Sequence, residues 1–156
     1  MLRHPTLSCG VLVCLLLSGC LVSPVERSGG PGSITIPNTN IRAVADASRK
    51  AFARYGYRPA PSNMPHWIAF ERPAGRTGEI MFGGWMHGGT AIRVRLNLVP
   101  IPGTSDIRIM PSVRRVSNAG RPGFERETTM ALRSWAAQLR PVLQDVQSRA
   151  ANAGPR

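Results

Sequence analysis

The stretch Ile92–Arg93–Val94–Arg95–Leu96–Asn97–Leu98 alternates apolar and polar side chains without a break. Successive side chains of a β-strand point to opposite faces of a sheet, so this alternation predicts a strand with one buried face and one polar face. Arg93, Arg95 and Asn97 share the polar face. A sheet that is buried on one side only is typical of antiparallel pairing. The stretch therefore predicts an antiparallel sheet that needs a cover on its apolar face.

Three other segments show the same period of two and predict further strands at residues 66–72, 79–82 and 107–113. Turn clusters rich in Gly and Pro, at residues 73–78, 88–90 and 100–105, separate the four segments. Such short connections favour a meander of antiparallel hairpins. Pro111 has no backbone N–H, so its strand should lie at a sheet edge or carry a bulge at that point.

A helix is predicted on the N-terminal side of these strands. From Ile41 to Tyr55, apolar residues recur at spacings of three and four, which is the pattern of an amphipathic helix. Asn40 or Thr39 can cap its start, and Gly56 suits the left-handed position just past its end.

A second helix is predicted to begin near Phe124. Residues from Thr128 to Val146 step by four and three along one apolar stripe. Glu125 and Glu127 would stabilise the start of this helix, where negative charge is favoured. Pro141 should kink or divide it.

The expected fold is a two-layer α+β domain over residues 39–150, with the order α-β-β-β-β-α. Two helices, each apolar on one side, can cover one face of a four-stranded antiparallel meander. Residues 151–156 are expected to be a frayed tail. The order resembles the layout of helix-grip-like domains found in some envelope lipoproteins, including one from the outer-membrane assembly machinery.

The first residues have the pattern of an export signal. Arg3 and His4 precede an apolar run at residues 10–17, which is too short to cross a bilayer. Leu17–Ser18–Gly19–Cys20 then resembles the lipobox of bacterial lipoproteins. The resemblance implies removal of residues 1–19, a diacylglycerol thioether on the Cys20 sulfur and an acyl chain such as palmitate on its amine. An uncleaved anchor helix and an ordinary secretory signal are the alternatives.

A lipid at Cys20 would hold the chain on a membrane, because two or more acyl chains anchor firmly. Residues 20–38 are rich in Gly and Pro and predict a flexible tether, although Ile34 and Ile36 allow a short strand there. In Gram-negative lipoproteins, aspartate after the lipidated cysteine commonly causes inner-membrane retention. Leu21 occupies that position, which favours the outer membrane facing the periplasm over the inner membrane.

The chain is strongly basic, with 20 Lys and Arg against 8 Asp and Glu. Loss of Arg3 with the signal lowers the net charge from +12 by one. An exported chain rarely meets nucleic acid, so no nucleic acid is expected. An anionic lipid or polymer surface, or an acidic protein, is the nearer partner. The alternative is that the charges are merely solvated.

No catalytic residue, cofactor or metal site is predicted. Cys9 and Cys14 would leave with the signal, and the sulfur of Cys20 would be modified. His66 and His87 lie far apart, without the local ligand pairs that zinc sites use. No Gly-x-Ser-x-Gly or Ser-x-x-Lys motif is present. A hydrolase whose site has no recognised motif is the less favoured alternative.

The polar face of the sheet is the first candidate binding surface. Arg, Trp and Met are enriched at protein interfaces, and the face would carry candidate partner-binding residues of these types: Arg93, Arg95, Arg108, Trp67 and Met110. A solvated face is the alternative. The sequence therefore favours a non-enzymatic, membrane-anchored envelope lipoprotein that acts as a basic interaction module, and it leaves the oligomeric state open.

A Gly-rich stretch at residues 83–89 is the second candidate. It surrounds Trp85 and His87 with four glycines, so these two side chains could bind a small ligand at a loop or pocket rim. A structural role is favoured over ligand binding, because Gly88 and Gly89 suit a tight hairpin turn and Gly83 and Gly84 suit a bulge.

Overall fold

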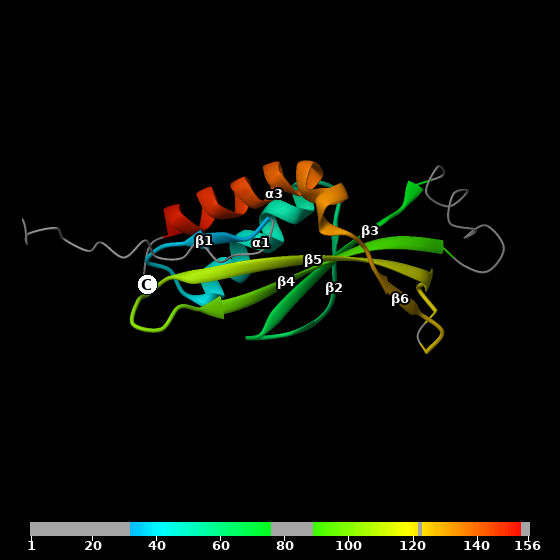
Figure 1. Ribbon diagram of the computed structural model, residues 1–156, viewed down its shortest axis with the longest axis horizontal. Coiled ribbons are helices and arrows are strands. Elements are labelled where there is room, and N and C mark those ends of the chain that lie inside the picture. The colour runs from blue at the N-terminus through cyan, green and yellow to red at the C-terminus, as the bar shows by residue number, and fades with distance from the viewer. Residues whose placement is uncertain (1–31, 76–88, 122, 154–156) are drawn as a thin grey trace, which may run out of the picture.

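The computed structural model describes residues 32–75, 89–121 and 123–153. Their elements are β1 (Ile34–Ile36), α1 (Ile41–Arg54), β2 (Arg58–Asn63), β3 (Trp67–Pro73), β4 (Gly89–Pro100), β5 (Ile107–Ala119), β6 (Arg126–Thr129) and α3 (Leu132–Ala153). Figure 1 shows both helices over the same face of the sheet. The predicted α+β fold with two helices on an antiparallel sheet is confirmed. In the described part of the chain, every helix is too short or too polar to span a bilayer.

The sheet is built around a meander. Its strands follow the order β1-β5-β4-β3-β2, every pair is antiparallel, and β6 also pairs with β5. Because β4 pairs along almost the whole of β5, the two short strands share the other edge of β5. There β1 lies beside Ile107–Ile109, and β6 lies beside Arg114–Ser117.

The helix-facing side of the sheet contains the residues that the alternation assigned to it. Ile92, Val94, Leu96 and Leu98 are all buried in one hydrophobic cluster with the inward faces of α1 and α3. Phe52 of α1 stacks on Phe70 of β3, with ring centroids 4.3 Å apart. Each such buried side chain stabilises the fold by about 1.5–3 kcal/mol, so this face fixes the two-layer arrangement.

The start and end of α1 agree with the sequence prediction. Asn40 has extended backbone angles, and its Oδ1 accepts a hydrogen bond of 2.9 Å from the N–H of Ala43. Gly56 follows the helix with a φ of +77°, a conformation that costs glycine little.

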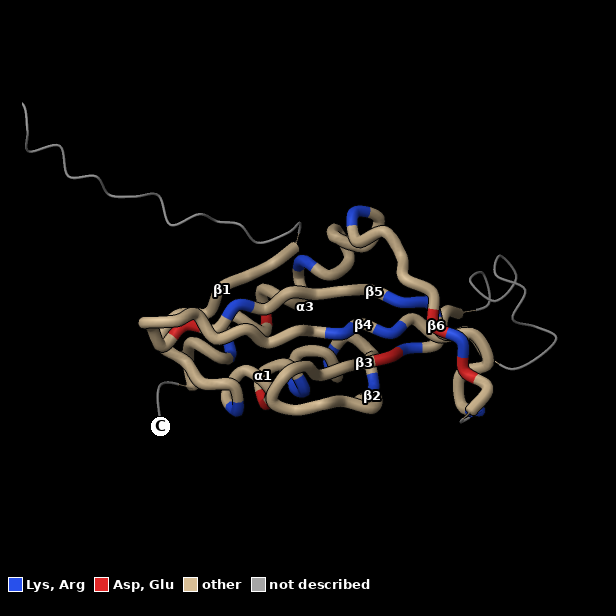
Figure 2. Tube along the Cα trace, turned by 60° about the horizontal axis from the view of Figure 1, so that its bottom comes forward, with Lys and Arg blue, Asp and Glu red and all other residues tan. Residues whose placement is uncertain are grey.

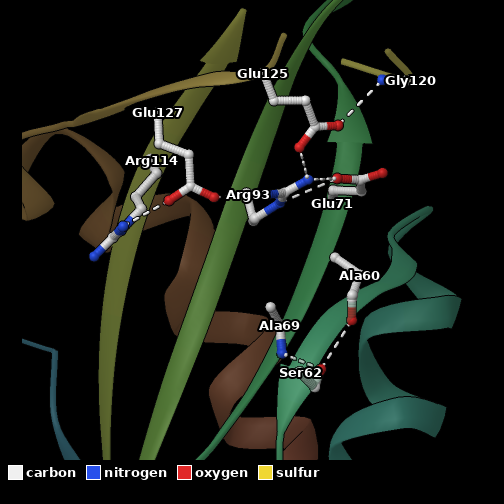
Figure 3. Close-up of polar contacts among 9 residues, drawn as sticks. All are labelled: Ala60, Ser62, Ala69, Glu71, Arg93, Arg114, Gly120, Glu125 and Glu127. Carbon is white, nitrogen blue, oxygen red and sulfur yellow. Dashed lines mark hydrogen bonds and ion pairs between the residues drawn. The ribbon is translucent and has the colours of Figure 1, made fainter. Parts of the chain in front are cut away.

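Two strands were missed. β2 contains Pro59 and Pro61, which have no N–H to donate, and the sequence pattern therefore did not indicate a strand. It lies at the end of the sheet and contains a register shift between Ala60 and Asn63. Across this shift the Ser62 hydroxyl accepts from the Ala69 N–H at 3.0 Å and donates to the Ala60 carbonyl at 2.8 Å (Figure 3).

The other missed strand is β6, which corrects the predicted start of the second helix. Residues 126–129 are all exposed and pair with β5 instead of beginning a helix, and α3 starts at Leu132. Thr128 is therefore not part of the helical stripe. The helix then continues through Pro141 as one element to Ala153, so residues 151–153 are helical and not frayed. The predicted strand at 79–82 lies outside the described residues.

Pro111 lies at a local edge of β5, as expected. The Val113 carbonyl accepts from the Met130 N–H at 2.9 Å, so Val113 directs its backbone groups away from β4. Pro111 is two residues earlier and has the same direction. It falls between the residues paired with β1 and those paired with β6, so its missing N–H removes no bond to either strand.

Candidate functional site

The face of the sheet opposite the helices carries the candidate partner-binding residues; we call it the open face. Figure 2 brings this face forward, with basic positions along β4 and β5 and acidic positions on β3 and beside β6. Arg93 lies between Glu71 of β3 and Arg114 of β5, whereas Asn97 lies between Trp67 and Met110. The register therefore gives the open face two ends with different chemistry.

At one end, Arg93 is the centre of a buried ion cluster. Its Nη2 lies 2.8 Å from Glu71 Oε2 and 3.1 Å from Glu125 Oε2, and its Nη1 lies 2.6 Å from Glu127 Oε1. Glu127 also accepts from Arg114 Nη1 at 2.6 Å. Figure 3 shows the carboxylates converging on the guanidinium from both sides of β4. We call Arg93, Arg114, Glu71, Glu125 and Glu127 the Arg93 cluster.

The electrostatics of the cluster favour the charged form of its members. Desolvation acts to raise the pKa of Glu127, but hydrogen bonds from Arg114 and Arg93 outweigh it and hold that pKa below the ordinary value of 4.5. Desolvation also acts to lower the pKa of Arg93. Hydrogen bonds to Glu71, Glu127 and Glu125 outweigh it and raise that pKa above the ordinary value of arginine. The cluster therefore remains an ion pair network at neutral pH.

Arg93 consequently does not offer a charge to a partner. Only 7% of the residue is exposed, and three carboxylates occupy its donors. Arg93 was expected to contribute to a partner-binding surface. In the structure it instead joins β4 to β3, through Glu71, and to the β6 segment, through Glu125 and Glu127. Glu125 and Glu127, expected at a helix start, are instead its ligands.

At the other end of the open face, Arg95 stacks on Trp67. The guanidinium carbon of Arg95 lies 4.0 Å from the centroid of the Trp67 ring system, a cation–π arrangement. Its Nε is buried and has no hydrogen-bond partner. Met110 and Val99 lie close by in register and are 39% and 41% exposed. With Arg108, which pairs with Val99, these residues form the Trp67 patch: Trp67, Arg95, Val99, Arg108 and Met110.

The carboxylates of the described residues are all occupied away from this patch. Asp46 pairs with Arg49, Asp145 pairs with Arg149, and Asp106 accepts the N–H of Asn38. The three glutamates belong to the Arg93 cluster. Arg95 and Arg108 therefore have no acidic partner among the described residues, and the patch presents net positive charge beside apolar surface.

Three predicted positions, Cys20, Trp85 and His87, lie outside the described residues. His66 is exposed at the start of β3, where its N–H donates to the Asn63 carbonyl at 2.9 Å. In the ranges that the structure describes, no three His, Cys, Asp or Glu side chains gather as a metal site would require.

The sequence correctly placed four residues of the patch on one face: Trp67, Arg95, Arg108 and Met110. It did not indicate Val99, and it did not indicate which carboxylates bind Arg93. Those ligands lie 22, 32 and 34 residues away along the chain, so no local spacing could reveal them. In comparisons with known proteins, no protein family model and no curated protein matches the chain.

Proposed function

We propose that this chain is a membrane-anchored envelope lipoprotein and that its domain is a non-enzymatic module binding an acidic segment of an envelope protein. The observation that carries the proposal is the Trp67 patch. There Arg95 is held over Trp67 with its Nε unpaired, beside exposed Met110 and Val99. A carboxylate that reached this guanidinium would gain a charge-assisted hydrogen bond.

The composition of the patch supports a protein partner over a bare anionic surface. Arg, Trp and Met are enriched at the buried centres of interfaces, and hot spots are most often Trp, Tyr and Arg. Trp67 offers apolar area next to the cation of Arg95, which stacks on its ring. An anionic polymer would use the charge of Arg95 and Arg108 but not the apolar side chains.

The sequence Leu17–Ser18–Gly19–Cys20 supports the location. In this proposal Cys20 carries the lipid, residues 21–31 lead to the domain, and the domain faces the periplasm from the outer membrane. The protein needs no cofactor or metal for this activity.

A site-specific cross-link tests the patch. We would replace Met110 with a photoreactive amino acid in cells and irradiate them, then compare adducts in the parental chain and in an Arg95→Ala/Arg108→Ala background. We expect one main protein adduct, reduced about tenfold in the double variant, which corresponds to about 1.4 kcal/mol of binding free energy.

Arg133→Ala/Arg140→Ala is the matched control, because it removes the same charge from exposed positions on α3. This control should leave the Met110 adduct unchanged, and neither double variant should change the unfolding midpoint of the domain. An adduct of equal yield in all three backgrounds would refute the proposal.

A further inference from the structure

A polar groove lies in the helix layer, away from the open face. It runs between the beginning of α1 and the end of α3 and has a volume of about 700 Å³. Its polar lining comes from both helices: Asn40, Arg42, Asp46, Lys50, Arg149 and Asn152. We call it the α1–α3 groove.

The groove carries an excess of positive charge. Its single carboxylate, Asp46, is already paired with Arg49 at 2.6 Å. Arg149 uses its Nε to bond Asp145 at 2.8 Å, which leaves its two terminal nitrogens free of any bond to the described residues. Arg42 and Lys50 are exposed and make no ion pair within the described chain. Arg42 and Lys50 thus line the hollow without an ion-pair partner among the described residues, and Arg149 adds its two terminal nitrogens.

The position of Arg42 increases this imbalance. It lies in the first turn of α1, which contains no acidic residue. The N-terminal end of a helix is its positive pole, where a cation is unfavourable and an anion is favoured. An anion in the groove would pair with Arg42 and Lys50 and face the positive pole of α1, and these attractions act against the negative pole of α3, whose last residues line the same groove.

We propose that the α1–α3 groove binds the phosphate of an anionic lipid headgroup. A phosphate suits the lining because its several acceptor oxygens can bond arginine forks, an ammonium and the amides of Asn40 and Asn152 together. The choice of a lipid rests on the proposed anchor at Cys20. The 12 residues from Cys20 to Pro31, when extended, span at most about 40 Å, so the groove can reach the membrane that holds the chain.

The test uses the chain from Leu21, which retains every core residue that the structure describes, all of them between Ile34 and Ala150. We would titrate it with dihexanoylphosphatidylglycerol, kept monomeric, and follow backbone amide resonances. Shifts should concentrate at Arg42, Lys50 and Asn152. At about 1 kcal/mol for each basic residue, Arg42→Ala/Lys50→Ala should weaken binding about 30-fold.

Two controls identify the ligand and the site. Arg133→Ala/Arg140→Ala removes the same charge as Arg42→Ala/Lys50→Ala, but from α3 and outside the groove, and it should keep the parental affinity. Dihexanoylphosphatidylcholine, which has no net charge, should cause no shifts. If inorganic phosphate shifts the same amides as strongly as the anionic lipid does, the ligand is free phosphate and the lipid assignment falls.

A purely structural role for the cations is also distinguishable. If Arg42 serves only to balance the carbonyl groups at the end of α3, then Arg42→Ala lowers the melting temperature while the parental chain shows no lipid-dependent shifts, and the proposal is overturned. Arg42→Gln/Lys50→Gln keeps polar side chains and provides a second variant. Because the titrated chain lacks Cys20, the result does not depend on whether the anchor exists.

Discussion

At the scale of single residues, Arg93 and Arg95 show how two identical side chains acquire opposite roles. Both lie on the open face of β4, two positions apart. Arg93 is opposite Glu71 and reaches the β6 segment, whereas Arg95 is opposite Ala69 and Ser112 and stacks on Trp67. The first is enclosed by carboxylates and stabilises the fold. The second has no acidic partner among the described residues, and its guanidinium stacks on the Trp67 ring.

We predict that Arg93→Met destabilises the domain far more than Arg95→Met does. Removing Arg93 leaves three carboxylates with one remaining cation, Arg114, which pairs with Glu127 alone. Breaking a buried ion pair costs about 3–5 kcal/mol, and because the glutamate side chains are 25–31% exposed, we expect about 2 kcal/mol here. Arg95→Met should change the free energy of unfolding by less than about 1 kcal/mol. Urea unfolding measures both, and equal losses would contradict the assigned roles.

The same cluster predicts a dependence of stability on pH. The pKa of Glu127 is lower in the folded chain than its ordinary value of 4.5. Its contribution to stability is therefore complete above about pH 4.5 and is lost as the pH falls through the lowered pKa. Unfolding in urea at about pH 6 and about pH 3 should show this loss. In Arg93→Met/Arg114→Met, the free energy of unfolding should differ less between these two pH values than it does in the parental chain. An unchanged difference would assign the acid sensitivity to other groups.

At the scale of elements, α3 continues as one helix through Pro141, which was expected to kink or divide it. Pro141 is exposed and cannot donate to the carbonyl of Ala137. The helix continues because Leu139, Val142, Leu143 and Val146 bury its other side in the core. Tertiary packing here outweighs the local preference against a proline in a helix.

Pro141→Ala should therefore stabilise the domain, because it restores one backbone hydrogen bond without disturbing the buried side. The expected gain in the free energy of unfolding is about 1–3 kcal/mol. Thermal and urea unfolding would measure it, with Arg140→Ala as a neighbouring exposed substitution that should change little. A loss of stability in Pro141→Ala would show that the helix requires the altered geometry of the proline.

Much of this architecture could be predicted from periodicity alone. The alternation at Ile92–Leu98 defined both faces of β4, and the spacing of three and four defined α1. The strands β2 and β6 could not be found this way, because one contains two prolines and the other is exposed at every position. The Trp67 patch was partly foreseen from face assignment. The Arg93 cluster was not, because its carboxylates meet only when β3, β4 and β6 are assembled.

At the scale of the whole molecule, the two proposed surfaces lie on different layers. The Trp67 patch is on the open face of the sheet, and the α1–α3 groove is in the helix layer. Figure 1 shows these two layers. A domain that contacts lipid through its helices would turn its sheet toward the periplasm. Membrane and protein partner could then be bound together without competing for the same side chains.

The proposed anchor is tested on the intact precursor. Cys20→Ser should abolish lipid labelling and leave the chain either unprocessed or released from the membrane fraction, because the thioether requires the Cys20 sulfur. Cys14→Ser is the matched control and should be lipidated normally. Lipid labelling that persists in Cys20→Ser would refute the assigned location.

The place of β1 in the sheet has a mechanical consequence. The chain enters the domain through β1, which is hydrogen-bonded to Ile107–Ile109 of β5, and β5 also bears Arg108 and Met110. In a chain held at Cys20, tension on the tether would pass across these backbone hydrogen bonds into the strand that carries the binding patch. Gln147 of α3 also donates to the Thr35 carbonyl of β1 at 3.3 Å, so α3 would share part of the load. A partner that pulled on the patch would therefore load the short β1–β5 ladder first, and that ladder would set the force at which the domain yields.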